Sequence, residues 1–229
     1  MRAKEISIII PVIYEAGIIN ESLRALKKIA PPNACEIIVV DGDSSGSTIQ
    51  AITEKNIKKI KAPRGRGVQM NAGAEHASGN ILLFLHADTL LPAKAIDHII
   101  ATCNDPGVAG GAFDLGIDSN RFLFRITERY VFLRSRMTKI PYGDQAIFLK
   151  KEIFDRMGGF NKMPIMEDID LMRRIKHHGY KIRFIPEQVK TSPRRWEKEG
   201  IVFSTFRNIL LSTMFYMGVS PKILKKWYK

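Results

Sequence analysis

The sequence LHADT, at residues 85–89, contains an aspartate that could bind a metal ion. Asp88 follows an apolar run with the composition of a buried strand. An aspartate at such a position commonly caps a helix or stabilises a turn. Carboxylates gathered at one sheet edge repel each other unless a cation joins them, and a hard divalent ion with phosphate oxygens would suit them. Asp88 is therefore the best candidate for a metal ligand, while His86 is either a second ligand or a side chain packed beside the site.

A second acidic group lies in the sequence DGDSSGST, at residues 41–48, after another apolar run. A turn between a strand and a helix, capped by Ser47 or Thr48, would explain its serine and glycine residues. That explanation does not require both Asp41 and Asp43. Their carboxylates could instead accept hydrogen bonds from a base or a ribose.

Two arginine-containing segments could contact a diphosphate. The sequence PRGRGVQMNAG, at residues 63–73, offers arginines and a flexible glycine-containing backbone, although it matches neither GxGxxG nor GxxxxGK. The sequence SPRRWEKEG, at residues 192–200, places two arginines beside a tryptophan. These three side chains form either a solvated patch with one packed ring, or a diphosphate clamp with an aromatic wall.

The sequence MEDIDLMRRIKHHG, at residues 166–179, offers a candidate general base. Glu167, Asp168 and Asp170 fall in the first turn of a predicted helix, where the helix dipole stabilises acids. Dipole stabilisation and surface ion pairs alone would explain them. An acid pair that opens a helix beside the glycine-rich loop 158–161 also suits proton abstraction from a hydroxyl.

The first half of the chain alternates strand and helix patterns, which predicts an α/β fold with a mostly parallel sheet and helices on both faces. The predicted strands are Ile6–Val12, Glu36–Val40, Lys58–Ala62 and Ile81–Leu85, and the predicted helices are Asn20–Ile29, Thr48–Lys55, Val68–Ala77 and Pro92–Cys103. Ligands of such sheets bind beyond the carboxyl ends of the strands. The polar residues there are Tyr14, Glu15, Asp41, Asp43, His86 and Asp88.

The second half has longer helical patterns. We predict strands at Val108–Leu115, Gly143–Leu149 and Lys181–Ile185, and helices at Arg121–Lys139, Lys151–Met157, Asp168–His178 and Glu199–Met217. Arg121, Arg125 and Arg129 recur at helical spacing among apolar residues, and the segment KILKKWYK follows the last helix. This pattern resembles a basic amphipathic helix that lies on a membrane; packing on the sheet or across a dimer interface is equally favoured.

The charge of the protein is unevenly distributed. The chain has 229 residues, 36 Lys and Arg, 23 Asp and Glu, and a net charge of +13. Residues 1–120 contain 12 basic and 13 acidic side chains, whereas residues 121–229 contain 24 and 10. A composition with 45% hydrophobic and 26% charged residues excludes a disordered chain. The charge asymmetry disfavours a uniformly basic nucleic-acid-binding protein, so we expect no nucleic acid partner.

Two cysteines, Cys35 and Cys103, do not make a disulfide framework, which favours a reducing cytosol. The apolar run of MRAKEISIIIPV ends at Pro11 and is too short for a signal peptide. The apolar stretch Ile201–Met217 is shorter than the roughly 20 residues of a spanning helix. We therefore expect a cytoplasmic protein, with a peripheral position at the inner face of the cell membrane left open.

Taken in order, these segments resemble the family 2 glycosyltransferases, an inverting group with the GT-A fold. The resemblance rests on SIIIPVIYEAG, IIVVDGDSSGST, RGRGVQMNAGAEHASGNILLFLHADT and GDQAIFLKKEIFDRMGGFNKMPIMEDIDLMRRIKHHG, and extends from Ile6 to Trp196. Together, LHADT, GDQA and SPRRW look most like a small bacterial subgroup, of which some members are named for arsenosugar biosynthesis. Three positions depart from the family pattern: Tyr14 replaces an Asn, His86 replaces the first Asp of DxD, and the Gln of QxxRW is absent.

The resemblance implies a Rossmann-like, mostly parallel mixed sheet flanked by helices, with a C-terminal helical extension. It divides the chain into a nucleotide-sugar-binding half (residues 1–115), an acceptor-side half of the same domain (116–198) and an amphipathic helical tail (199–229). A sugar would pass from a nucleotide sugar, with UDP favoured, to an acceptor hydroxyl, with Mn²⁺ or Mg²⁺ on the diphosphate. The acceptor is left open between a lipid-linked and a small molecule, and a homodimer is also left open.

The resemblance also implies roles for individual residues. Asp168 would be the general base, paired with Glu167, and Asp88 would bind the metal. The nucleotide sugar would contact Pro11, Tyr14, Glu15, Asp41, Asp43, Arg66, Asn71, His86 and Ala87. The acceptor and diphosphate would contact Asp144, Gln145, Arg194, Arg195 and Trp196.

Two other functions compete with glycosyl transfer. A sugar-phosphate nucleotidyltransferase would use a related sheet and metal carboxylates, but it needs an early glycine-rich loop with Arg and Lys, which IYEAGIIN at residues 13–20 lacks. A module that binds a membrane surface or nucleic acid would use the basic second half.

Overall fold

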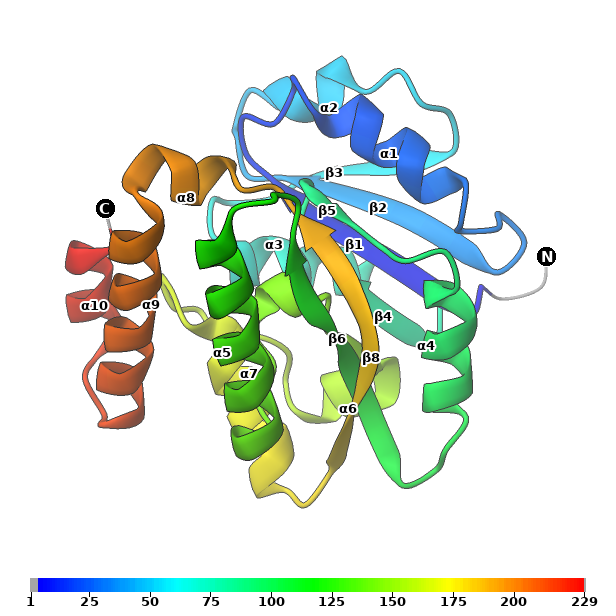
Figure 1. Ribbon diagram of the computed structural model, residues 1–229. Coiled ribbons are helices and arrows are strands. Elements are labelled where there is room, and N and C mark those ends of the chain that lie inside the picture. The colour runs from blue at the N-terminus through cyan, green and yellow to red at the C-terminus, as the bar shows by residue number, and fades with distance from the viewer. Residues whose placement is uncertain (1–3, 229) are drawn as a thin grey trace.

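The computed structural model describes residues 4–228, which form one mixed sheet with helices on both faces (Figure 1). The strands are β1 (Ile6–Val12), β2 (Cys35–Asp41), β3 (Ile57–Lys61), β4 (Ile81–Phe84), β5 (Thr89–Leu90), β6 (Val108–Ile117), β7 (Phe148–Lys150) and β8 (Lys181–Thr191). Their order in the sheet is β3-β2-β1-β4-β7-β6-β8-β5, and β5 and β7 run antiparallel to their neighbours. The other six strands therefore end at the same edge of the sheet.

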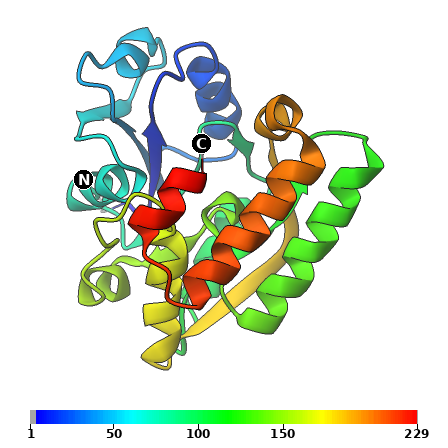
Figure 2. The ribbon, with the colours of Figure 1, turned by 90° about the vertical axis from the view of Figure 1, so that its left-hand side faces the viewer.

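The helices cover the two faces as two separate apolar clusters. One face is covered by α1 (Ile19–Lys27), α2 (Ser47–Ala51), α4 (Ala95–Cys103) and α5 (Phe122–Thr138). The other is covered by α3 (Arg66–Glu75), α6 (Lys151–Arg156), α7 (Glu167–His177) and α10 (Pro221–Trp227). The helices α8 (Arg194–Glu199) and α9 (Ile201–Tyr216) follow β8, and α9 lies beside α5 (Figure 2).

Strand β1 shows why the first half was predictable. Ile6, Ile8 and Ile10 pack into one apolar cluster and Ile9 into the other, so each face of the strand is buried. A strand covered on both faces must be apolar along its whole length, which the sequence displays as an unbroken run. The prediction of Ile6–Val12 is confirmed to the residue.

Three predicted elements of the second half need correction. The strand predicted at Gly143–Leu149 is wrong at its start, because Gly143–Gln145 form a 3₁₀ turn, η1. The strand predicted at Lys181–Ile185 continues to Thr191. The helix predicted at Glu199–Met217 is interrupted at Gly200, whose φ of +91° ends α8 and starts α9. In the first half, α2 ends at Ala51 rather than Lys55 because Ile52 is extended.

The sheet continues through both predicted halves, since residue 115 lies within β6. Among residues 4–228, the helices are too short or too polar to cross a membrane. Met1–Ala3 of the N-terminal segment and Lys229 of KILKKWYK lie outside the described residues.

Candidate active site

A cavity of about 190 Å³ opens at the carboxyl edge of the sheet, where it is bordered by α5 and α9. Its charged lining residues are Arg66, Asp88, Arg134, Asp144, Asp168 and Arg195. Aromatic walls come from Tyr130, Tyr142, Trp196 and Tyr228. The cavity thus combines three carboxylates and three guanidinium groups with ring faces that could hold a sugar or an apolar group.

Asp168 is held in the cavity wall by two backbone amides. Its Oδ2 accepts a hydrogen bond from the N–H of Gly143 (2.6 Å), and its Oδ1 accepts one from the N–H of Ile169 (2.8 Å). The side chain is 9% exposed and lies in the first turn of α7, where the helix dipole favours a negative charge. A carboxylate fixed at a cavity wall can accept a proton from a bound hydroxyl.

The neighbouring acid, Glu167, has a different environment. Its carboxylate is 1% exposed and pairs with the Nε of Arg66, whose pKa it raises above the usual range. Glu167 does not line the main cavity. Of the predicted acid pair, Asp168 is therefore the one that can meet a ligand there, and Glu167 holds Arg66 in place beside it.

The residues after β4 place the imidazole of His86 near the carboxylate of Asp88. Burial, together with the charge of Arg66, lowers the pKa of His86 to about 4, so its ring is uncharged at neutral pH. The Asp88 side chain is 31% exposed, and its Oδ2 lies 3.6 Å from Nη2 of Arg194. The same nitrogen lies 3.7 Å from Oε2 of Glu15. Burial and the charge of Asp88 raise the pKa of Glu15, although Arg194 opposes them.

These residues fit a divalent ion that is shared with a substrate. Residues 4–228 contain no group of three His, Cys, Asp or Glu side chains placed to enclose a metal. Mg²⁺ and similar ions commonly take one or two protein carboxylates and complete their coordination with phosphate oxygens and water. Asp88 supplies one such carboxylate, and the neutral ring of His86 retains an unprotonated nitrogen.

Asp41, the last residue of β2, and Asp43 are used mainly within the turn that follows the strand. Asp41 is fully buried: its Oδ1 accepts the N–H of Asp43, and its Oδ2 accepts those of Thr48 and Ile49. Hydrogen bonds from Ser45 and Ser47 lower the pKa of Asp43 to about 2. Both side chains lie at the predicted edge, but their acceptors are occupied by the turn that leads into α2.

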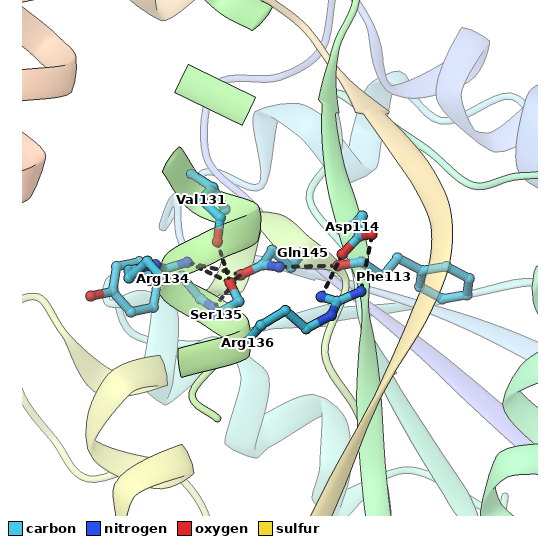
Figure 3. Close-up of polar contacts among 8 residues, drawn as sticks. Phe113, Asp114, Val131, Arg134, Ser135, Arg136 and Gln145 are labelled. Carbon is cyan, nitrogen blue, oxygen red and sulfur yellow. Dashed lines mark hydrogen bonds and ion pairs between the residues drawn. The ribbon is translucent and has the colours of Figure 1, made fainter. Parts of the chain in front are cut away.

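Asn71 and Gln145 also make their hydrogen bonds within the protein. The amide of Asn71 donates to the carbonyl of Phe160 (2.8 Å) and accepts from its N–H (2.9 Å), which fixes the loop before α7. Gln145 is fully buried; its Oε1 accepts from Arg134 (3.0 Å), Ser135 and the N–H of Tyr142, and its Nε2 donates to Phe113. Figure 3 shows its amide between α5 and β6, bonded to both.

Residues after β8 complete the predicted set. Trp196 lines the cavity and packs edge-on against Phe124, with 6.2 Å between ring centroids. Arg195 lines the cavity and lies 4.6 Å from the ring centroid of Tyr228, whereas Arg194 is more exposed and reaches toward Asp88. Pro11 is a partly buried residue of β1 and Ala87 is buried after β4; neither lines the cavity.

The sequence profile of Glycosyl transferase family 2 matches residues 7–163, more than half of the chain. This chain belongs to glycosyltransferase family 2. The predicted enzyme class is thereby confirmed, and among the predicted alternatives the family favours glycosyl transfer over nucleotidyl transfer.

Two curated relatives of this glycosyltransferase carry similar names. It is 26% identical over 220 residues to "Probable glycosyltransferase YdaM" of Bacillus subtilis. This match covers 85% of this chain and 51% of YdaM. It is 24% identical over 207 residues to "Glycosyltransferase AglE" of Haloferax volcanii. This match covers 83% of this chain and 67% of AglE. The chain thus spans about half the length of YdaM.

Solved glycosyltransferase structures share the fold. The mannosyltransferase PcManGT of Pyrobaculum calidifontis, in complex with GDP-Man and Mn²⁺, has a TM-score of 0.67 at 24% identity, covering 83% of this chain and 57% of that chain. S. aureus TarS residues 1–349 in complex with UDP-GlcNAc has a TM-score of 0.62 at 17% identity, covering 82% of this chain and 58% of that chain. The predicted GT-A class of α/β fold is confirmed.

Several cavity residues of this family 2 glycosyltransferase were missed by the sequence reasoning. The Arg134 guanidinium lies 3.2 Å from the ring centroid of Tyr142, and both line the cavity with Tyr130. Tyr142 directly precedes GDQA, which was the available signal. Arg134 falls outside the arginine series at helical spacing, and no local pattern distinguished it.

Proposed function

We propose that this glycosyltransferase moves a sugar from a nucleotide sugar, with UDP favoured, to an acceptor hydroxyl with inversion at the anomeric carbon. The observation that carries the proposal is the Asp168 carboxylate, fixed by two backbone amides in the wall of a cavity that Asp88 also lines. A base and a diphosphate-binding carboxylate at one cavity are the two groups that this reaction needs.

The donor would bind at the carboxyl ends of β1, β2 and β4. Tyr14 is 69% exposed there and could offer its ring to a base. Arg194, which is half-exposed, lies within 4 Å of both Glu15 and Asp88 and could pair with a diphosphate. Mn²⁺ or Mg²⁺, held by Asp88 with His86 adjacent, would neutralise the charge of the leaving diphosphate. The GDP-Man and Mn²⁺ in PcManGT and the UDP-GlcNAc in TarS support a donor of this class.

Asp168 would act on the acceptor. As the acceptor oxygen bonds to the anomeric carbon, the bond from that carbon to the diphosphate oxygen breaks, and the hydroxyl proton passes to the Asp168 carboxylate. Arg195, which lines the same cavity, would stabilise the diphosphate that leaves. The motifs LHADT, GDQA and SPRRW support a small bacterial subgroup, but they leave the acceptor undefined.

Asp168→Asn tests the proposal. The variant should lose sugar transfer by about 10²- to 10⁴-fold, the usual contribution of a general base, and still bind UDP with Mn²⁺ in a thermal-shift titration. Asp88→Asn should instead lose metal-dependent UDP binding. Transfer by Asp168→Asn at the wild-type rate would remove the base assignment. Failure of the wild type to bind UDP, GDP or dTDP with Mn²⁺ would remove the donor assignment.

A further inference from the structure

Exposed apolar side chains are concentrated on two neighbouring helices. We call these residues the α5–α9 face: Phe122, Leu123, Ile126, Tyr130, Leu133 and Met137 of α5, with Val202, Phe203, Phe206 and Leu210 of α9. Among residues 4–228, the other large exposed hydrophobic side chains are Tyr14, Leu90, Tyr216, Met217, Ile223 and Trp227, and four of these lie in or directly after α9 and α10. Monomeric soluble proteins rarely leave such a contiguous surface uncovered.

The two helices that carry these side chains are neighbours in the fold. They lie next to each other in both views (Figures 1 and 2), and Thr127 of α5 contacts Thr205 of α9 through their hydroxyls at 3.3 Å. A hollow at the N-terminal ends of the helices is lined by the apolar residues Leu123, Val202 and Phe203, and also by Arg121 and by Glu197 of α8. Exposed apolar side chains of the two helices therefore meet at this hollow.

Cations outnumber acids around this surface. Helices α5, α9 and α10 contain a single acidic residue, Glu128, which is 7% exposed, accepts a hydrogen bond from the N–H of Ile117 and forms an ion pair with Arg125. Glu197 of α8 is an exposed acid at the hollow. Arg129 is exposed beside the apolar residues of α5, and α10 carries three lysines, whereas Arg125 is already paired with Glu128. A second copy of the chain would meet these cations with cations of its own and with Glu197 as the exposed acid at the hollow, whereas anionic lipid headgroups would complement them.

We propose that the α5–α9 face binds an anionic membrane surface, with its apolar side chains among the lipid headgroups and acyl chains and with Arg129 and the α10 lysines near the phosphates. Tyr130 belongs both to this face and to the wall of the active-site cavity. Membrane binding therefore turns the cavity toward the lipid. On the proposed function, the acceptor hydroxyl is then carried by an amphipathic molecule held in that membrane.

Co-sedimentation with vesicles tests the binding. Wild-type protein should sediment with phosphatidylcholine–phosphatidylglycerol vesicles at low salt, and at least about ten-fold less with pure phosphatidylcholine vesicles or at high salt. Phe206→Glu should lower binding by about ten-fold or more, because an exposed phenylalanine that would enter the lipid is replaced by a charge. The matched control is Ala101→Glu, which adds the same charge to an exposed position of α4 and should bind like the wild type.

Two results would overturn the proposal: no sedimentation at low salt, or equal binding by Phe206→Glu and Ala101→Glu. A dimer that Phe206→Glu dissociates would assign the face to self-association instead. Binding of UDP with Mn²⁺, measured on the same variants, reports on the donor site alone. If the wild type does not bind UDP with Mn²⁺, the proposed function is rejected, and the vesicle result is unaffected.

The two tryptophans of the chain allow the orientation to be tested. In Trp227→Phe, the remaining indole is Trp196, which lines both the cavity and the adjoining hollow. Brominated lipids in the anionic vesicles should quench its fluorescence by about half or more if the cavity faces the membrane. Vesicle binding without quenching would show that another surface carries the contact.

Discussion

Two pairs of acidic residues look alike in the sequence but have different surroundings in the fold. One pair lies at the end of β2, and the other opens α7. Asp41 and Asp43 accept hydrogen bonds from their own turn, within eight residues along the chain. Glu167 pairs with Arg66 of α3, and Asp168 is held by Gly143 of η1 as well as by its own helix. An acid whose partners are local stabilises a turn, whereas an acid fixed by distant elements can face a cavity that those elements enclose.

Asp41→Asn should lower the stability of the folded protein. The substitution leaves one side-chain N–H₂ group facing backbone N–H donors in a fully buried turn. Hydrogen bonds to a buried charged group contribute about 1.5–3 kcal/mol each, so we expect a loss of about 3 kcal/mol in the free energy of unfolding. Urea unfolding measures it. Asp88→Asn, at a partly exposed carboxylate, is the control and should change stability by less than about 0.5 kcal/mol. Equal losses in both variants would contradict the comparison.

The sequence predicted the positions of these acids better than their surroundings. Asp88 was predictable because it follows an apolar strand, and Asp168 because it lies in the first turn of a helix. Both features can be recognised from neighbouring residues in the sequence. The 3₁₀ turn at Gly143–Gln145 was not, because Gln145 is held there by Arg134, Ser135 and Phe113, which are 10 to 32 residues away. The residues around the cavity come from helices whose contact with each other no local pattern encodes.

Gly143→Ala should disturb Asp168 from a separate element. A β carbon at this position would lie 3.0 Å from Asp168 Oδ2 and 3.5 Å from His86 Nε2. The carboxylate must then shift and lengthen its bond to the backbone amide, which we expect to lower kcat by about ten-fold, since a small misplacement of a catalytic group is costly. Steady-state kinetics with any donor that the wild type turns over measures the effect.

Gly107→Ala provides the matched control for Gly143→Ala, because its nearest neighbour would be Asp105 Oδ1 at 3.4 Å, an ordinary contact on an exposed loop. It should retain wild-type kcat. An unchanged kcat in Gly143→Ala would show that the position of Asp168 does not depend on η1.

Asp43 should make the stability of the protein depend on pH. Its pKa is lowered to about 2 in the folded state by hydrogen bonds from Ser45 and Ser47, below the usual value of 3.8. A carboxylate with a lowered pKa stabilises the fold fully above pH 3.8, and its contribution is lost as the pH falls toward 2. Wild-type stability should therefore fall more steeply between pH 5 and pH 2 than that of Asp43→Asn. Parallel pH profiles in urea unfolding would contradict this assignment.

Tyr14 tests the same edge of the sheet with the smallest expected effect. Its φ is +58°, a left-handed conformation that asparagine adopts more readily than tyrosine. Tyr14→Asn should raise the free energy of unfolding by about 0.5–1 kcal/mol. Asn56 has a φ of +59° and is exposed, so Asn56→Tyr is the reverse change and should lower it by a similar amount.

The two variants should differ in donor binding. If the exposed ring of Tyr14 packs on the base, Tyr14→Asn loses that contact while it gains stability, and its affinity for UDP with Mn²⁺ should fall about three- to ten-fold. Asn56→Tyr, remote from the strand end after β1, should bind UDP like the wild type. A Tyr14→Asn variant that is both less stable and unchanged in UDP binding would mean that the tyrosine is retained for packing, and the ring would no longer be a candidate for contact with the donor.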